Sequence, residues 1–144
     1  ADNLGVYSGW VTVHGDLVLA GGFAGFGDTW PDGSEGNKVF ALSLAALYAA
    51  AASGEPVDVF ETGELFSGPS DVQLTRKGEL LTVETNWETG DTTIAVHTLT
   101  SGAAPSVATT DVLSEGAIYT SAREIPGTHG FLLGFSDGYA VVTR

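Results

Sequence analysis

Three segments of this chain share one pattern, a turn glycine followed by a pair of apolar residues. The segments are His14-Gly15-Asp16-Leu17-Val18, Lys77-Gly78-Glu79-Leu80-Leu81 and His129-Gly130-Phe131-Leu132-Leu133. Strand-like runs flank each segment, so each one predicts a β-hairpin. A unit of this kind cannot bury its apolar faces alone and must stack on its neighbours, so the pattern constrains the fold more than any local motif does.

The strands around these hairpins group into units. The pattern predicts four strands at 10–14, 17–20, 38–44 and 56–60, four at 71–75, 79–85, 92–99 and 106–113, and three at 117–122, 131–135 and 139–143. A long loop rich in Gly and Asp is expected at 21–37. The alanine-rich stretch 45–53 predicts a short helix with Gly54 as its C-terminal cap. Four-stranded units of roughly 45–60 residues are typical of β-propeller blades.

The middle unit carries a resemblance to a known family. Its segment 69–83, PSDVQLTRKGELLTV, combines a strand led by proline, a polar turn with glycine and a second apolar strand, and Ile94-Ala95-Val96 follows as a third strand. This phrase resembles the blades of the lactonase-like and nitrite-reductase-type β-propeller superfamily, which includes bacterial surface-antigen-like blades. The resemblance implies an all-β fold and, for lactonase-like members, a calcium-dependent hydrolase.

Members of that family close a ring with about six to eight blades, and three blades cannot close one. We therefore expect 1–144 to be a single domain of three antiparallel four-stranded blades, at 9–61, 69–113 and 117–144, which form half of a propeller. A strand at 3–8 should complete a blade of a neighbouring chain, which also removes an exposed sheet edge. That partner is another copy or a second propeller-half chain. A β-sandwich is the alternative fold.

Charge and composition narrow the classes of partner. The chain has 18 acidic and 5 basic residues, and its net charge of −13 repels the phosphates of nucleic acids and anionic lipid heads. No apolar stretch approaches the ~20 residues of a membrane-spanning helix, so we expect no membrane insertion. Cysteine is absent, which excludes disulfides and thiolate chemistry. The sequence begins with Ala1, and we expect a processed N-terminus and an extracellular or periplasmic location.

The loop that ends near Asn37 is the first candidate site, for a calcium ion. Calcium takes about six to eight hard oxygen ligands. The loop offers four residues with such oxygens: Asp28, Asp32, Glu35 and Asn37. The spacing is similar to half of an Asp-x-Asp-x-Asp-Gly loop, although Trp30 takes the middle ligand position. Because Pro31-Asp32-Gly33 is also an ordinary turn sequence, a plain loop is the alternative interpretation.

A second candidate site combines tryptophans with acids. Trp30 and Trp87 fall in equivalent loops of neighbouring units, and Glu88 and Asp91 lie beside the second of them. An exposed indole covers the apolar patches of a sugar ring while carboxylates accept hydrogen bonds from its hydroxyls, so this group predicts a carbohydrate-binding surface. The alternative is that each indole covers the end of a sheet.

Two histidines fall at equivalent places in the predicted units. His14 and His129 occupy equivalent turns, with Lys77 in the matching middle position. The histidines either bind zinc in a two-chain assembly or are simply solvated. No nucleophile elbow, His-Glu-x-x-His motif or phosphate loop is present. In the lactonase-like propellers that the chain resembles, acids and amides line the axis. Asp71 and Asn86 are the nearest candidates for such residues.

We therefore expect a non-catalytic extracellular or periplasmic β-propeller module for binding or assembly, with a glycan or a cation as ligand. A calcium-dependent lactonase-like hydrolase and a purely structural subunit of a surface assembly are the alternatives.

Overall fold

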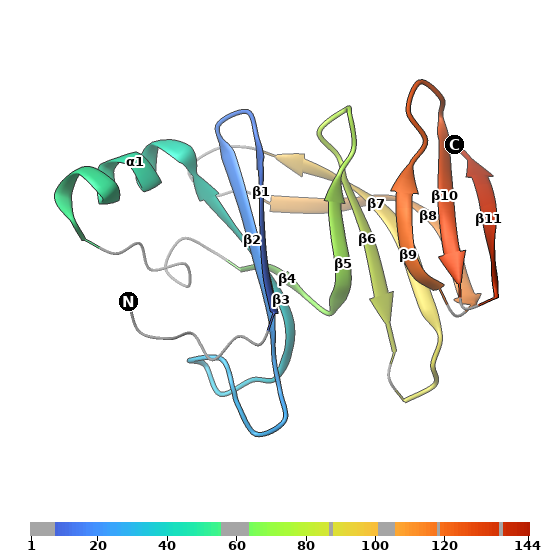
Figure 1. Ribbon diagram of the computed structural model, residues 1–144, viewed down its shortest axis with the longest axis horizontal. Coiled ribbons are helices and arrows are strands. Elements are labelled where there is room, and N and C mark those ends of the chain that lie inside the picture. Colours follow the sequence, from blue (N-terminus) through green and yellow to red (C-terminus); the bar gives the residue numbers. More distant parts are fainter. Residues whose placement is uncertain (1–7, 56–63, 87, 101–105, 118, 136) are drawn as a thin grey trace. The chain divides into compact units, whose positions relative to one another are not determined.

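The computed structural model describes residues 8–55, 64–86, 88–100, 106–117, 119–135 and 137–144. The strands of unit 1 are β1 (Ser8–His14), β2 (Leu17–Ala24), β3 (Gly36–Ser43) and β4 (Glu64–Ser67), with helix α1 (Leu44–Ser53) between β3 and β4 (Figure 1). The strands that follow are β5 (Pro69–Leu74), β6 (Leu80–Thr85), β7 (Thr92–Thr100), β8 (Ser106–Ala117), β9 (Tyr119–Glu124), β10 (Gly130–Phe135) and β11 (Gly138–Thr143). The chain divides into two compact units, with 1–68 and 100–106 in unit 1 and 69–99 and 107–144 in unit 2.

The strands form three antiparallel sheets, and chain neighbours are sheet neighbours in all of them. The sheets have the orders β1-β2-β3-β4, β5-β6-β7-β8 and β11-β10-β9. This confirms the expected all-β fold with one short helix and the expected grouping of strands into four, four and three. The assignment of the sheets to propeller blades stays a prediction.

Several strand boundaries differ from the expected ones. β2 continues to Ala24 and β3 begins at Gly36, so the loop at 21–37 is shorter than predicted. Gly21 and Gly22 belong to β2 because β1 and β3 pair with them on both sides, which overrides their poor strand propensity. The strand expected at 56–60 lies outside the described residues, as does most of the strand expected at 3–8. β4 is the fourth strand of the first sheet.

Helix α1 matches the prediction closely because both of its ends are capped. The Ser43 hydroxyl accepts a hydrogen bond from the Ala46 N–H at 3.0 Å, which satisfies a donor in the first turn. Gly54 adopts a left-handed conformation with φ of 75°, and its N–H donates to the Ala50 carbonyl at 2.8 Å. The helix therefore begins and ends at the residues that the capping side chain of Ser43 and the glycine at 54 predict.

The third hairpin turns at Gly127 and not at Gly130. Pro126 and Gly127 form the centre of a turn that the Thr128 N–H closes onto the Ile125 carbonyl at 3.2 Å, and Gly127 has φ of 77°. Proline followed by a glycine with positive φ is the signature of a type II turn. Gly130 instead pairs with Thr143 inside the sheet. The predicted equivalence of Gly130 with the turn glycines of the other hairpins is wrong, because this connection is longer.

The core of unit 2 is the contact between its two sheets. One face of the sheet β5–β8 meets one face of the sheet β9–β11, and the buried residues that meet there are Leu81, Val83, Ile94, Val96, Ala122, Phe131 and Leu133. Two polar contacts join the same sheets at their β5 and β9 sides. The Gln73 side chain donates to the Ala122 carbonyl at 2.8 Å, and Arg123 pairs with Asp71 at 2.7 Å.

Leu132 and Leu133 provide a matched test of this core, because strand alternation sends these neighbours to opposite faces of β10. Leu133 is 0% exposed and Leu132 is 40% exposed. We expect Leu133→Ala to lower the free energy of unfolding by about 2–5 kcal/mol, since it leaves a cavity. Leu132→Ala should cost about 1 kcal/mol or less. Urea unfolding at low protein concentration measures both, and equal losses would contradict the assigned faces.

Candidate functional site

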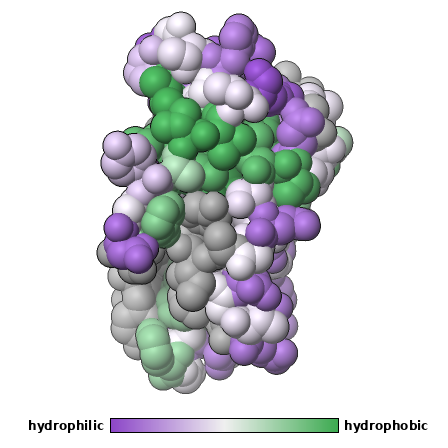
Figure 2. All heavy atoms as spheres, turned by 90° about the vertical axis from the view of Figure 1, so that its right-hand side faces the viewer, coloured by the Kyte–Doolittle hydropathy of each residue, from purple (hydrophilic) through white to green (hydrophobic). Residues whose placement is uncertain are grey.

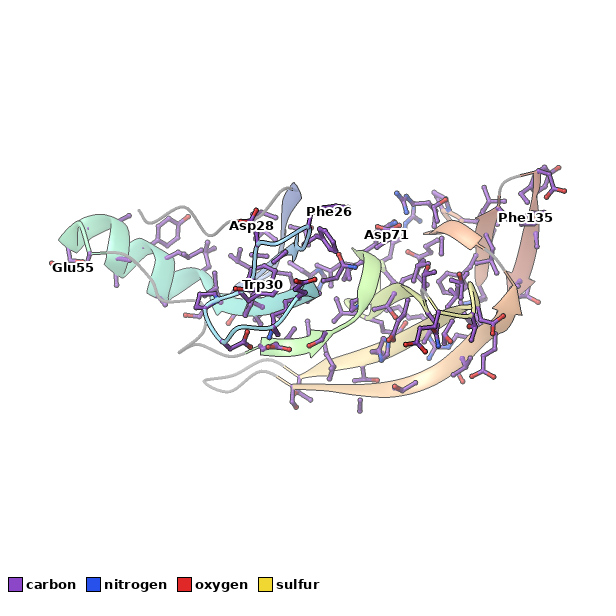
Figure 3. All side chains as sticks on the ribbon, turned by 90° about the horizontal axis from the view of Figure 1, so that it is seen from below. Phe26, Asp28, Trp30, Glu55, Asp71 and Phe135 are labelled. Carbon is purple, nitrogen blue, oxygen red and sulfur yellow. The ribbon has the colours of Figure 1, made fainter. Side chains whose placement is uncertain are left out.

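Trp30, one of the two tryptophans of the predicted carbohydrate-binding surface, is part of the core of unit 1. It is 2% exposed, its indole N–H donates to the Gly36 carbonyl at 2.8 Å, and its ring packs edge-on against Phe40 (Figure 3). The exposed aromatic residue of this loop is Phe26, at 91% exposure and with φ of 59°. Neither face of the Trp30 ring is therefore open to a sugar. The alternative interpretation, in which the indole covers the end of the sheet, fits its burial.

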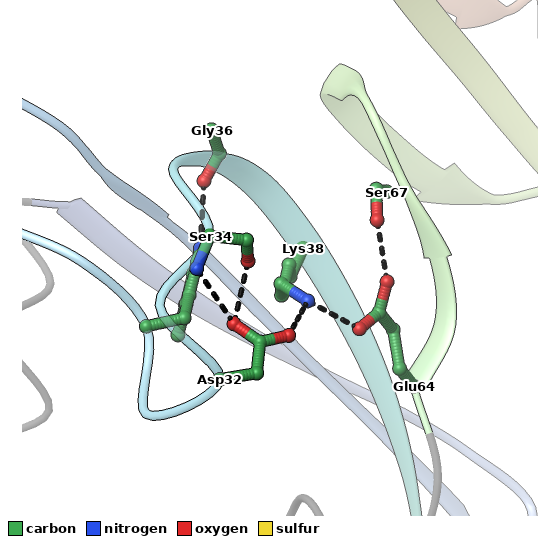
Figure 4. A network of polar contacts seen from close by, with 7 residues as sticks. Asp32, Ser34, Gly36, Lys38, Glu64 and Ser67 are labelled. Atoms are coloured by element: carbon green, nitrogen blue, oxygen red, sulfur yellow. Dashed lines mark hydrogen bonds and ion pairs between the residues drawn. The ribbon is translucent and has the colours of Figure 1, made fainter.

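Asp32, a predicted calcium ligand, is bound to a buried lysine. The Lys38 ammonium, on β3, lies 2.6 Å from Asp32 Oδ2 and 2.5 Å from Glu64 Oε2 on β4 (Figure 4). Ser34 donates to the other oxygen of Asp32 through its backbone N–H at 3.0 Å and its hydroxyl at 2.6 Å. The Ser67 hydroxyl donates to Glu64. The network ties the loop, β3 and β4 together.

All three charged groups of this network are held in their ionised forms. The hydrogen bond from Lys38, with those from Ser34, lowers the pKa of Asp32 well below its usual range. Burial raises the pKa of Glu64, but the hydrogen bonds from Lys38 and Ser67 outweigh it, and the pKa is lowered. Burial lowers the pKa of Lys38, but its two carboxylate partners outweigh burial and raise it. The lysine ammonium thus occupies an oxygen of Asp32 that a calcium ion would need.

The other predicted calcium ligands do not join Asp32. The backbone N–H of Asp28 donates to the Gly25 carbonyl at 3.2 Å, and Glu35 is exposed. Asn37 lies in β3, where its carbonyl accepts a hydrogen bond from the Gly68 N–H at 2.9 Å. Over the described ranges, no three acidic or histidine side chains gather to hold a metal ion. The calcium site stays a prediction that this geometry does not support.

The second predicted site lies at the turn between β6 and β7. Trp87 is outside the described residues, and Glu88 and Asp91 are both exposed. The Asn86 side-chain oxygen accepts hydrogen bonds from the N–H groups of Glu88 at 2.9 Å and Thr89 at 3.3 Å. Asn86 therefore shapes the turn. Asp71, the other lactonase candidate, is paired with Arg123.

A cleft of about 350 Å³ opens in unit 2 beside the turns β5–β6 and β9–β10 and the residue that follows β11. Its lining residues are Lys77, Glu79, Glu124, Thr128, His129, Phe131 and Arg144. Lys77 and His129 were predicted to lie in equivalent turns, and the structure brings them to this one cleft. The rest of the cleft was missed. The signal that could have found it is Arg76-Lys77, the one adjacent basic pair in a chain with five basic residues.

The polar walls of the cleft are held in place by hydrogen bonds. Arg144 donates from Nη1 to both carboxylate oxygens of Glu79, at 2.9 and 2.8 Å, and from Nε to Asp111. Glu124 accepts the backbone N–H of Arg76 at 2.8 Å. The Thr128 hydroxyl donates to the Ile125 carbonyl at 3.0 Å and accepts the Gly130 N–H at 2.9 Å. A ligand therefore meets donors and acceptors that are already oriented.

The charges of the lining cancel. Lys77 and Arg144 contribute two positive charges, Glu79 and Glu124 contribute two negative ones, and the ring of Phe131 supplies an apolar part. The pKa of Arg144 is raised by its hydrogen bonds to Glu79 and Asp111 in spite of partial burial. The cleft thus offers fixed charged hydrogen-bonding groups with no net charge.

Comparison of the chain with protein families, with curated proteins and with solved structures found no match. Among the described residues, no helix is long and apolar enough to span a membrane.

Replacement of the buried lysine tests its network. Lys38→Met should lower the urea midpoint at pH 7, because it leaves Asp32 and Glu64 beside each other without a cation. Lys77→Met, at an exposed lysine, is the control and should change the midpoint little.

The same variant has a predicted pH dependence. Asp32 and Glu64 have pKa values below those of the unfolded chain, so their contribution is present above about pH 4 and is lost as the pH falls. The gap between the native chain and Lys38→Met should therefore narrow between pH 7 and pH 3. A gap that widens towards pH 3 would contradict the assignment.

Proposed function

We propose that the chain is a non-catalytic binding module built from propeller-like blades, and that it binds a neutral, hydroxyl-rich ligand such as a sugar in the cleft of unit 2. The observation that carries this proposal is the balanced charge of a cleft whose arginine, glutamates and threonine are already fixed by hydrogen bonds.

The class of ligand follows from charge. The chain carries a net charge of −13, so an anion is repelled at long range. A cation would meet Lys77 and Arg144 in the cleft. A neutral ligand with many hydroxyl groups avoids both costs, and each hydroxyl can donate to Glu79 or Glu124 and accept from Lys77 or Arg144. Hydrogen bonds to charged groups contribute more than neutral ones, about 1.5–3 kcal/mol each.

A binding role, rather than a catalytic one, is supported by the existing bonds of the lining groups. The Thr128 hydroxyl is used by the backbone on both its donor and acceptor sides. Glu79 is bound to Arg144, and Glu124 is bound to the Arg76 N–H. A hydrolase needs a nucleophile or water beside a base that is available to take a proton. These bonds fix Glu79 and Glu124 in place and leave each carboxylate with further lone pairs that accept hydrogen bonds from a ligand.

The cleft is a better binding site than the acidic loops that the sequence favoured. Trp30 is buried, and Asp32 is bound to Lys38. Sugar binding through Trp30 or Asp32 would require breaking one of these contacts, whereas the lining groups of the cleft are already in place. The proposal therefore keeps the expected type of ligand and moves its site.

Titration with a panel of mono- and oligosaccharides, followed by ligand-observed NMR and calorimetry, tests the proposal. At least one neutral sugar should bind. Lys77→Ala and Glu124→Gln should each weaken it about tenfold or more, since each removes a charged hydrogen-bonding group. Glu84→Gln, at an exposed acid outside the cleft, is the matched control and should leave the affinity unchanged. Failure of every sugar to bind, or equal affinities for the two cleft variants and the native chain, would overturn the proposal.

A further inference from the structure

The face of the sheet β9–β11 that points away from the core of unit 2 is apolar and exposed. Leu132 on β10 is 40% exposed, and Tyr139 and Val141 on β11 are 73% and 56% exposed. Figure 2 looks onto the side where these strands lie and shows apolar side chains gathered in one continuous area. We call the face that carries Leu132, Tyr139 and Val141 the outer face. An apolar sheet face of this kind marks an interaction surface.

The strand registers show which part of the other sheet the outer face corresponds to. Leu81 pairs with Val96 across β6 and β7, and Leu132 pairs with Val141 across β10 and β11. On the first-strand side, Leu81 pairs with Gln73 and Leu132 pairs with Arg123. Leu81 and Val96 therefore occupy the same places in their sheet as Leu132 and Val141 do in theirs.

The same registers relate Ile94 to Tyr139. Val83 pairs with Ile94, and Gly134 pairs with Tyr139.

The corresponding residues have opposite environments. Leu81, Ile94 and Val96 are 2%, 0% and 0% exposed, because the sheet β9–β11 covers them. The same positions in the sheet β9–β11 are held by Leu132, Tyr139 and Val141. Within the described residues, no sheet covers these three side chains, and they remain exposed. The outer face thus continues the sheet-on-sheet contact inside unit 2 and is suited to receive one more sheet.

Charge indicates which molecule supplies the sheet that covers the outer face. The central positions of the outer face are Ser121, Arg123, Leu132, Gly134, Tyr139 and Val141, and none is acidic, although the chain has 18 acidic and 5 basic residues. A basic partner would be drawn to the acidic parts of the surface. An acid-free face is what allows contact with another strongly acidic chain. Inside unit 2, a sheet of this same chain covers the corresponding face of the sheet β5–β8. A sheet of a second copy is therefore the partner that fits best.

We infer that the outer face of β9–β11 binds a sheet of a second copy of this chain. The inference rests on the interpretation of the sheets as repeating units that the proposed function also uses, but it does not depend on the ligand of the cleft. Because each copy carries −13, long-range repulsion opposes association at low ionic strength and is screened by salt. Self-association should therefore strengthen as the salt concentration rises.

Sedimentation velocity and light scattering at several protein and salt concentrations test the inference. The native chain should reach twice its mass of 14.8 kDa, with tighter association at 0.5 M than at 0.05 M salt. The double variant Leu132→Thr and Val141→Thr should weaken dimerisation at least tenfold, and Tyr139→Ser alone should weaken it to a smaller extent. Tyr48→Ser, at a residue 68% exposed on α1, is the matched control and should leave it unchanged.

A monomer at every concentration and salt condition would overturn the inference. So would a dimer that both outer-face variants leave intact while their unfolding midpoints match that of the native chain. Association that weakens with salt would equally contradict it, because attraction between opposite charges behaves in that way. Sugar binding to the cleft of a strictly monomeric chain would leave the proposed function standing and reject this inference alone.

Discussion

The contact between the sheets β5–β8 and β9–β11 determines most of what unit 2 can do. Leu81 and Val96 on one sheet are fully buried against residues such as Leu133 on the other. Burial of this kind supplies the main favourable free energy of a small β fold, at about 25 cal/mol per Å² of apolar surface. It holds the turns β5–β6 and β9–β10 beside each other and so creates the cleft. It also leaves one face of β9–β11 uncovered.

The few basic residues of the chain stabilise contacts between segments that are distant in the sequence. The chain has five basic against 18 acidic residues, and two of the bases are placed where they join distant segments. Lys38 connects a loop to β4 through Asp32 and Glu64, and Arg144 connects the end of the chain to Glu79 and Asp111. Each of these bases lies between two carboxylates, so the charge repulsion within the acidic chain is reduced at points where segments meet.

The sequence predicted the elements whose signals are local. The turns at Gly15 and Gly78 and the capped helix at 45–53 depend on neighbouring residues, and the structure confirms them, together with the number of strands in each sheet. The pairing of Asp32 with Lys38, and the choice between an exposed and a buried Trp30, could not be predicted, because they depend on how the loop folds back over β2 and β3. The cleft was missed for the same reason: Lys77, Glu124 and Arg144 are far apart in the chain. The third turn has one added residue, and for this reason the predicted equivalence of Gly130 with the other turn glycines was wrong.

The most direct test of a covered outer face is its reactivity in solution. The chain has no cysteine, so a Val141→Cys variant carries a single thiol on this face and Tyr48→Cys carries one on α1. If a second copy covers the outer face, the alkylation rate of the Val141→Cys thiol falls as the protein concentration rises, while that of the Tyr48→Cys thiol stays constant. Equal rates for both thiols, independent of protein concentration, would contradict the account.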